Sequence, residues 1–468
     1  MAERFDVVII GGGPGGYAAA LYGAAAGLNV AMVEKDKVGG TCLNRGCIPA
    51  KEYLETAAVF RTIQHASTFG INVDAPTIDF GVAQQRKQKV VDQLVGGLSG
   101  LLKKRKVKVV NGFGSLEAPG TVAIDDGTVL EADAVILAAG SVPRTLPGFD
   151  VDGIYVHTSD EVLSWTALPK RIAVVGGGVI GCEFASALLD LGCEVTILEF
   201  LPVLMPPVDK DIREVVVKQL TKRGITAITE AKVTGHTPTG AGTATAVAYT
   251  DKTGAQQTIE VDAIVMSVGR RPFADNLVGP AAGVEIDERG FVKVDGTMRT
   301  SVQGVWAVGD IVNTPQLAHV GFAEAIIAIK DILGEDAIPM DYDKVPWCIY
   351  SHPEAAYAGL TEEDARKRGY DIVVEKLKFV GNGRAIIVGE TDGLVKIIAQ
   401  KNPDGTAGTV LGVHMVGPWV TEQLGAGYLA VNWEATIDEI AALIQPHPTF
   451  SEAFGEAVMA LTGRGLHG

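Results

Sequence analysis

The stretch FDVVIIGGGPGGYAAA, residues 5–20, decides the fold of the first part of this 468-residue chain. Residues 5–10 form an apolar, β-branched run that predicts a buried strand. A glycine-rich turn follows, and an alanine-rich segment from about Tyr17 to Ala26 predicts a helix. A second short strand, Val30–Val33, then ends at Glu34. Strand, glycine turn, helix, strand and acid together indicate a Rossmann-like α/β unit.

In this context the glycines match a dinucleotide-binding fingerprint. Turn glycines allow the backbone to approach a pyrophosphate at the helix N-terminus, where free N–H groups and the helix dipole favour an anion. The carboxylate of Glu34 can then hold a ribose diol. We expect the contacts to a nucleotide at Gly11, Gly13, Gly16 and Glu34.

The same unit returns later in the chain, at Arg171–Glu199. A strand at Ile172–Val175 leads into the turn GGGVIG, residues 176–181, then into a helix and a strand that ends in the acid. All four key positions recur at a constant offset of 165 residues, and they are Gly176, Gly178, Gly181 and Glu199. This constancy predicts two nucleotide-binding domains.

Glu199 also discriminates between nicotinamide cofactors. A carboxylate at this strand end favours a free 2′-hydroxyl and repels a 2′-phosphate, for which a nearby arginine is expected. Phe200, Leu201 and Pro202 follow instead. The sequence therefore favours NADH over NADPH at the second site.

The composition of the chain limits its class. Its length suggests about three domains, and 57 glycines suit an enzyme with tight turns and close backbone approaches to ligands. The formal charge of −16 argues against a nucleic-acid partner. The densest basic run, residues 103–106, is predicted to be a solvated helix end.

The start of the chain and its apolar runs bear on location. An apolar strand begins by Phe5, which leaves no room for a signal or transit peptide, and no apolar run reaches the roughly 18 residues of a spanning helix. We expect a soluble, cytoplasmic protein. In a reducing compartment its five cysteines do not form a structural disulfide framework.

Two of the cysteines lie close together in GGTCLNRGCIPAK, residues 39–51. On an ideal helix the Cα atoms of Cys42 and Cys47 would be roughly 8.7 Å apart, whereas a disulfide needs less than about 7 Å. A bridge therefore requires a distorted helix, which Asn44, Gly46 and Pro49 permit. A strained bridge is easily reduced and suits catalysis. A zinc site would need further ligands at suitable spacing, so we predict no metal. From these residues alone, a redox-active pair and an incidental one remain open alternatives.

With this motif the chain resembles the pyridine nucleotide-disulfide oxidoreductases, and the resemblance covers essentially its whole length. Within the family the motifs are most similar to those of members that oxidise dihydrolipoamide with NAD⁺. Further motifs follow in the family's order, and they are ILAAGS (136–141), SVGRRP (267–272), WAVGD (306–310) and QLAH (316–319).

The resemblance implies which cofactor each unit holds and what the cysteines do. The first fingerprint would bind FAD and the second NAD, an assignment that residue chemistry alone could not make. Cys47 would lie against the flavin, while Cys42 would exchange with the substrate. Lys51 and Glu183 look like the family's ion pair near the flavin, although an ordinary surface lysine and a solvated helix residue are the alternatives. The remaining cofactor contacts it implies are Thr41, Gly114, Gly140, Asp310, Ala318, Val233 and Gly269.

A thiol substrate needs a base, because the thiolate is the reactive species. Histidine titrates in the right range, and among eight histidines His447 is singled out by the prolines on either side of it, in QPHPTFSE, residues 445–452. A structural histidine in a proline-rich loop is the alternative. The segment is similar to the family motif in which the histidine is the acid/base and the glutamate, here Glu452, its partner. Family members place it across a two-fold axis from the other subunit's cysteines, so a homodimer is expected.

The resemblance also suggests the domain boundaries. Residues 1–148 and 273–345 would form the FAD domain, 149–272 the NAD domain and 346–468 an α+β dimerisation domain. It implies oxidation of dihydrolipoamide carried by lipoyl domains of 2-oxoacid dehydrogenase complexes or by the glycine cleavage H protein. Three positions depart from the family's common residues, and these are Arg45, Ala50 and Gln445. Because His447 is retained, we expect Gln445 to tune the activity and not to abolish it.

Several other functions fit these residues less well. A glutathione-type reductase that uses NADPH is the nearest enzyme alternative, and Glu199 argues against it. Mercuric reductase and a thioredoxin reductase tail lack support because no extra cysteine pair precedes Gly468. A transhydrogenase would not need the cysteine pair. A non-catalytic nucleotide-binding module would need neither the pair nor His447.

Overall fold

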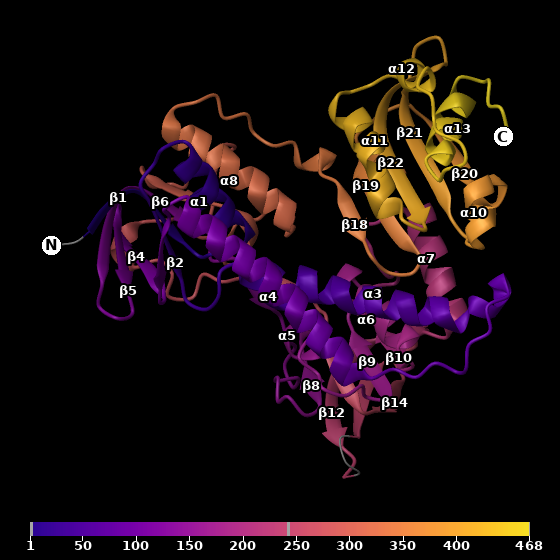
Figure 1. Ribbon diagram of the computed structural model, residues 1–468, viewed down its shortest axis with the longest axis horizontal. Helices are drawn as coiled ribbons and strands as arrows, with labels where there is room; N and C mark the ends of the chain where they lie inside the picture. Colours follow the sequence, from indigo (N-terminus) through magenta and orange to yellow (C-terminus); the bar gives the residue numbers. More distant parts are fainter. Residues whose placement is uncertain (1–2, 241–243, 468) are drawn as a thin grey trace.

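The structure, a computed structural model, describes residues 3–240 and 244–467. Figure 1 shows three bodies along the chain, each built on its own sheet. The first lies near the N-terminus, the second in the middle of the chain, and the third carries the C-terminus. The mixed α/β class predicted from the repeated strand–helix pattern is confirmed.

The first body contains the first glycine turn. Its central strands run parallel in the order β3-β2-β1-β6, and β17 joins β6, so the chain returns to this sheet about 170 residues after leaving it. The strands β4 and β5 continue the sheet beyond β6 in antiparallel fashion. The elements are β1 (Glu3–Ile10), α1 (Pro14–Ala25), β2 (Val30–Glu34), β3 (Lys108–Asn111), β4 (Gly114–Ala118), β5 (Thr121–Ile124), β6 (Val129–Leu137), β17 (Val305–Ala307) and α8 (Ala318–Leu333).

The second body repeats this plan. Its parallel sheet has the order β11-β10-β9-β15-β8, and a three-stranded antiparallel sheet, β12-β13-β14, accompanies it. The elements are β8 (Val156–His157), α5 (Ser159–Val162), β9 (Arg171–Val175), α6 (Val179–Asp190), β10 (Glu194–Leu198), α7 (Lys210–Arg223), β11 (Thr226–Ile228), β12 (Lys232–Pro238), β13 (Thr245–Thr250), β14 (Gln256–Val261) and β15 (Ala263–Met266). Two short strands, β7 (Ser141–Pro143) and β16 (Arg270–Pro272), pair where the chain passes between the bodies.

The third body is an antiparallel sheet of order β18-β19-β22-β21-β20, with α11 against β19 and α13 against β20 (Figure 1). Buried aliphatic and aromatic side chains between these helices and the sheet form its core. The elements are β18 (Trp347–Ile349), β19 (Glu354–Gly359), α9 (Glu362–Lys367), β20 (Ile372–Lys378), α10 (Gly383–Val388), β21 (Leu394–Lys401), β22 (Ala407–Gly417), α11 (Val420–Asn432), α12 (Ile437–Ala441) and α13 (Glu452–Leu461).

Three helices near the cysteine motif connect the bodies. The long helix α3 packs against both α4 and α6, and Figure 1 shows it between the second and third bodies. The helix α4 ends just before Arg105, and residues 103–106 are exposed, as predicted for a solvated helix end. These elements are α2 (Gly40–Arg45), α3 (Cys47–Gln64) and α4 (Phe80–Lys104).

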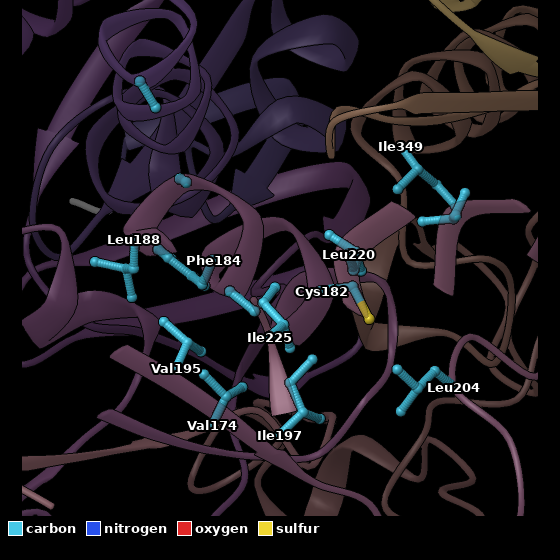
Figure 2. Packing of buried hydrophobic residues seen from close by; sticks show 14 of the residues in the cluster. Val174, Cys182, Phe184, Leu188, Val195, Ile197, Leu204, Leu220, Ile225 and Ile349 are labelled. Carbon is cyan, nitrogen blue, oxygen red and sulfur yellow. The ribbon is translucent and has the colours of Figure 1, made fainter. Parts of the chain in front are cut away.

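Helix α6 is the best buried of the helices that border the site. Its apolar side chains, among them Cys182, Phe184 and Leu188, pack with strand residues such as Val195 and Ile197 (Figure 2). Burial of this face fixes the helix against its sheet. Among the described residues, no helix combines the length and the apolar character needed to span a bilayer.

Candidate functional site

The two cysteines of the GGTCLNRGCIPAK motif lie on different helices. Helix α2, which carries Cys42, ends at Arg45, and Gly46 interrupts the helical path with φ −143° and ψ −111°. Cys47 then begins α3. The interruption is the distortion that a bridge between these residues requires. The structure holds them as free thiols whose side chains contact each other.

Helix α2 rests directly on the first glycine turn. Gly39 donates its N–H to the Gly12 carbonyl at 2.8 Å. Gly40 has a positive φ of +54°, and a Cβ atom there would lie 2.6 Å from the Cα of Gly13. No side chain fits between these two backbones. The cysteine motif and the nucleotide turn are therefore one structural unit, which explains why they are adjacent in the sequence.

The environment of Cys47 favours its thiolate. The hydrogen bond from Cys42 lowers the pKa of Cys47 to about 7, burial raises it, and the Lys51 ammonium lowers it. Its position at the N-terminus of α3 acts in the same direction, because the helix dipole stabilises an anion. The same contact with Cys47, together with burial, raises the pKa of Cys42 well above its usual range. Above about pH 7 the reduced pair therefore holds one negative charge, on Cys47.

Lys51 and Glu183 form a pair next to the cysteines. The Lys51 Nζ lies 2.9 Å from Glu183 Oε2, and the other carboxylate oxygen accepts the Tyr350 N–H at 2.8 Å. Lys51 also lies 4.8 Å from the centroid of the Tyr350 ring. The Glu183 side chain is only 8% exposed, so the alternative of a solvated helix residue does not describe it. The connecting helix α3, the second body and the third body therefore meet at this pair.

The first fingerprint forms the turn that the sequence predicts. Gly11 has φ +110°, and a Cβ there would lie 2.3 Å from the Ala138 carbonyl oxygen, while a Cβ at Gly16 would collide with Gly11. Gly13 is the N-cap of α1. The Glu34 carboxylate is oriented by the N–H groups of Gly12 and Asp36, at 2.7 and 2.8 Å. Burial raises its pKa, against the effect of the Gly12 N–H.

The other residues expected at FAD lie around this turn or along the edge of the first sheet. A small cavity of about 60 Å³ is lined by Gly11, Glu34 and Gly114, together with aromatic residues. Gly140 follows β6 with φ +73°. Asp310 accepts a hydrogen bond from Ser141 Oγ at 2.6 Å, Thr41 lies in α2, and Ala318 begins α8.

The second fingerprint has the same geometry. Gly176 has φ +104°, and a Cβ there would lie 2.4 Å from the Ser267 carbonyl oxygen. A Cβ at Gly181 would lie 2.1 Å from the Gly176 carbonyl oxygen, whereas a Cβ at Gly178, the N-cap of α6, would meet no heavy atom within 4 Å. Glu199 accepts the N–H groups of Gly177 and Leu201 at 2.5 and 2.6 Å. Gly269 has φ +98°, and Val233 lies in β12, packed on the core of this body.

These features fit two bound dinucleotides. The open space next to Gly178, at the start of α6, leaves room for a phosphate group to reach the backbone. Two buried side-chain atoms, Ser267 Oγ and Gln316 Nε2, have no hydrogen-bond partner among the described residues. They belong to the motifs SVGRRP and QLAH, which the resemblance places in the family's order, and a ligand would satisfy them. In the described ranges no group of three or more metal-ligating side chains has the arrangement of a metal site.

His447 is paired with Glu452 at the far end of the chain. The His447 Nδ1 lies 2.7 Å from Glu452 Oε1, and the Thr449 N–H donates to the other carboxylate oxygen at 2.7 Å. Burial raises the pKa of Glu452, but these two contacts outweigh it and hold the pKa below its usual range. With Nδ1–H donating to the carboxylate, Nε2 is left as the proton acceptor.

The structure does not bring His447 to the cysteines within one chain. Its side chain is 78% exposed, and across residues 3–240 and 244–467 it forms no hydrogen bond or ion pair with Cys42 or Cys47. Leu443 and Ile444, just before it, are 63% and 95% exposed. Two exposed aliphatic side chains therefore precede the His447–Glu452 pair.

Sequence reasoning missed two tyrosines. Burial raises the pKa of Tyr17 to about 12, and Cys42 and Cys47 add to that effect, so its ring lies near the pair. Tyr350 contacts Lys51 and Glu183. Tyr17 lies one turn into α1, directly after the predicted glycine turn, and this position could have indicated a residue near the site. Tyr350 is far from the pair in sequence, and no local pattern indicates that contact.

Comparisons with known proteins match this arrangement over the whole chain. Residues 5–325 match the family model described as pyridine nucleotide-disulphide oxidoreductase, and residues 345–458 match its dimerisation domain. The chain is 41% identical to the dihydrolipoyl dehydrogenase of Bacillus subtilis and 38% identical to that of Zymomonas mobilis, with 100% of both sequences covered in each case.

Solved structures of similar proteins have the same fold. The crystal structure of LpdA from Mycobacterium tuberculosis superimposes with a TM-score of 0.90 at 27% identity, covering 98% of this chain and 100% of the other. The HOCl-induced flavoprotein disulfide reductase RclA from Escherichia coli has a TM-score of 0.85 at 27% identity, covering 97% and 99%.

Proposed function

The chain belongs to the pyridine nucleotide-disulphide oxidoreductase family, and we propose that it is a dihydrolipoyl dehydrogenase, which oxidises dihydrolipoamide and reduces NAD⁺ to NADH. The single observation that carries this proposal is the contact between Cys42 and Cys47 on a helix break that rests on the first nucleotide turn. Full-length similarity to dihydrolipoyl dehydrogenases from several species supports the choice of substrate.

FAD and NAD are the cofactors of this family. FAD would be held by the first glycine turn with Glu34, Thr41, Lys51, Gly114, Gly140, Asp310 and Ala318, and NAD by the second turn with Glu183, Glu199, Val233 and Gly269. Bound FAD supplies the chemistry that couples oxidation of two thiols to reduction of a nicotinamide. Glu199 and the absence of an arginine in the next three residues favour NAD over NADP.

The sulfur chemistry then follows from the chain's own residues. His447 Nε2 of one subunit takes the proton of a substrate thiol, and the thiolate attacks Sγ of Cys42 in the oxidised pair of the other subunit. The Cys42–Cys47 bond breaks, and Cys47 leaves as a thiolate, which Lys51 and the α3 N-terminus stabilise. The second substrate thiol attacks the mixed disulfide and its proton passes to the departing Sγ of Cys42, which releases lipoamide and leaves Cys42 as a thiol. Glu452 orients His447 and stabilises its charged form.

The protein is a homodimer, in keeping with the dimerisation domain of its family. We propose residues 346–468 as that domain, with 1–148 and 273–345 binding FAD and 149–272 binding NAD. The exposed position of His447, next to the apolar Leu443 and Ile444, supports an active site completed by the partner subunit.

Partners and location are also proposals. Lipoyl domains of 2-oxoacid dehydrogenase complexes, or the glycine cleavage H protein, are the proposed carriers of the dithiol. A cytoplasmic location is in keeping with these partners.

A substrate panel tests the function. The purified flavoprotein is mixed with dihydrolipoamide or glutathione disulfide, each with NAD(H) and with NADP(H), and kcat/KM is measured for every pair. We expect dihydrolipoamide with NAD⁺ to exceed all other combinations by at least about 100-fold. A preference for glutathione disulfide with NADPH would replace the proposal by a glutathione-type reductase.

A further inference from the structure

Helix α6 carries a polar stripe on the side away from its apolar core. Glu183, Ser186 and Asp190 are spaced three and four residues apart, which places them on one face. The opposite face packs into the hydrophobic cluster of Figure 2. Each residue of the stripe is bonded to another part of the chain, so the helix is held on both faces.

The first two residues of the stripe hold the loop that enters β19. Glu183 Oε1 accepts the Tyr350 N–H at 2.8 Å, and Ser186 Oγ accepts the His352 N–H at 2.9 Å. Glu183 Oε2 remains for Lys51, at 2.9 Å. The loop at residues 350–352 therefore fixes the carboxylate that faces Lys51.

The third residue, Asp190, binds two arginines. Arg61, at the end of α3, donates to one carboxylate oxygen, and Arg223, the last residue of α7, donates to the other. The three side chains are 9%, 20% and 17% exposed, for Asp190, Arg61 and Arg223 respectively. Pairs that are this well buried hold a defined geometry, since an unpaired charge at such a site is costly.

Arg223 links this triad back to the loop. Its guanidinium donates to the His352 carbonyl at 2.6 Å and to Ser186 Oγ at 3.1 Å, in addition to Asp190. It thus spans α6, α7 and the third body with the planar fork that only arginine provides. Burial raises the pKa of nearby Glu390, and Arg61 and Arg223 oppose that effect, so a second acid faces the two cations.

An exposed pair next to Arg223 provides a natural comparison. Lys222 lies 3.6 Å from Asp392, and the two side chains are 68% and 58% exposed. This pair also joins α7 to the third body, but it touches neither the stripe nor the loop. Exposed pairs of this kind contribute little to stability or geometry.

We propose that Asp190 and Arg223 are positioning residues, which hold α6 and the 350–352 loop so that Glu183 keeps Lys51 beside Cys47. The inference deepens the proposed function and rests on it for the role of Cys47. The titratable or charged groups that shift the pKa of that thiol are Cys42, Lys51 and Glu183, and Tyr17, whose own pKa both sulfurs raise, lies close by. None of them is Asp190 or Arg223, so the two residues act only through α6 and the loop.

Site-specific alkylation tests the proposal. Wild-type protein and the variants Arg223→Met, Arg223→Lys and Asp190→Asn are reduced and then treated with iodoacetamide across a pH series. Mass spectrometry quantifies the modification of Cys47, both in the holoenzyme and after removal of the flavin. We expect half-maximal modification near pH 7 in the wild type, from the lowered pKa of Cys47. Arg223→Met and Asp190→Asn should move it up by about one pH unit, and Arg223→Lys by less, because Lys51 is less firmly placed.

Steady-state kinetics give a second readout. We expect kcat for dihydrolipoamide to fall by about 10-fold in Arg223→Met while KM changes by less than about threefold, because the substrate is not contacted. Lys222→Met is the matched control and should leave both the alkylation profile and kcat unchanged.

Two outcomes would overturn the inference. If the pH profile of Cys47 alkylation is unchanged in variants with a lowered Tm, the triad only stabilises the fold. If Lys222→Met shifts that profile as much as Arg223→Met does, Arg223 has no specific positioning role. If Arg223→Met does not fold, Asp190→Asn, which keeps the shape of the side chain, decides the same question. A wild-type protein that fails to oxidise dihydrolipoamide would contradict the proposed function alone, because the alkylation profile does not depend on the natural substrate.

Discussion

The ammonium group of Lys51 lies 2.9 Å from the Glu183 carboxylate, although 132 residues separate the two in the sequence. Lys51 belongs to the helix that begins at Cys47, and Glu183 to the first turns of the second nucleotide unit. Glu183 and Cys47 both raise the pKa of Lys51, against the effect of burial. The charge next to the redox pair therefore depends on how the two units pack.

Loss of the Lys51 charge should make Cys47 harder to ionise. In Lys51→Met the thiolate loses a favourable cation, so the pKa of Cys47 should rise above its wild-type value of about 7. The thiolate fraction at pH 7 should then fall, and the pH profile of Cys47 alkylation should move to higher pH by about one to two units. Lys35→Met, which removes an exposed lysine that is not among the groups shifting the pKa of Cys47, is the control. A profile that moves to lower pH would contradict the assigned interaction.

Each cysteine of the pair should be essential for thiol turnover. Cys42→Ser and Cys47→Ser should each lower kcat for dihydrolipoamide by at least about 1,000-fold, because no disulfide can form. Reduction of an artificial dye by NADH should survive, since that reaction needs no sulfur. Cys193→Ala, at a buried cysteine of the second body, should keep most of the lipoamide turnover. Normal turnover in either serine variant would refute the redox assignment.

Mixed dimers test whether two chains share each active site. His447→Gln alone should slow dihydrolipoamide oxidation by about 100- to 10,000-fold, the usual range for loss of an acid/base group. Random reassociation of His447→Gln with Cys42→Ser should restore about a quarter of the wild-type rate, because half of the dimers then carry one intact site. If the sites lie within single chains, no activity returns.

Glu199 should set the cofactor preference. We expect kcat/KM for NADH to exceed that for NADPH by at least about 100-fold, since the carboxylate repels a 2′-phosphate. Glu199→Gln should narrow this NADH-to-NADPH ratio by about 10-fold, because KM for NADPH falls when the repulsion is removed and KM for NADH rises when the ribose diol loses its acceptor. Glu230→Gln, at an exposed acid just after β11, should leave the ratio unchanged. A ratio that is insensitive to Glu199→Gln would remove the proposed role.

A buried charge cluster should make the protein acid-sensitive. Lys396 in β21 is 1% exposed and pairs with Asp209, Asp211 and Glu362 at 2.9, 2.5 and 2.8 Å. Burial raises the pKa of Asp209, but His414 and Lys396 more than offset it, and the pKa values of the other two acids are also lowered. For Lys396, whose pKa is raised, burial acts in the opposite direction and the acids outweigh it.

The sign of the pH effect follows from these directions. Carboxylates with a lowered pKa stabilise the fold fully above their unfolded values of about 4, and this contribution is lost as pH falls through the lower folded values. The Lys396 contribution is complete below about pH 10 and is lost only above that. Lys396→Met should therefore lower the free energy of unfolding by about 3–5 kcal/mol at pH 7 and by much less near pH 3. Thermal unfolding of Lys396→Met at both pH values measures this loss. Lys367→Met, which removes one partner of an exposed ion pair, is the control.

Local sequence patterns predicted the parts of the site that are local in space. Both glycine turns form because only glycine tolerates the positive φ of positions 11 and 176, where a Cβ would collide with a neighbouring carbonyl oxygen. The need for a helix break between the cysteines followed from helix geometry, and Gly46 provides it. His447 and Glu452 are five residues apart, so their contact was within reach of the same reasoning.

Contacts between distant segments were not accessible in the same way. The chain passes through the second sheet and returns to the first before it reaches β18, so these contacts join residues that are far apart in the sequence. For this reason neither the approach of Tyr350 to Lys51 nor the two arginines at Asp190 produce a periodic sequence pattern. Lys51 and Glu183 were paired only through resemblance to the family. The side chains that bind across bodies are scattered single residues, and their partners are set by packing.

The abutment of Gly40 on Gly13 limits what protein engineers can transplant. A sulfur relay transplanted into another dinucleotide-binding fold would have to keep the glycine at position 40, because a Cβ there would lie 2.6 Å from the Cα of Gly13. An alanine at position 40 would force the two backbones apart and move the thiols away from the glycine turn. Transfer of the motif to another protein therefore requires a residue without a Cβ atom at this point. A copied cysteine motif that carries a side chain there would hold its thiols too far from the turn.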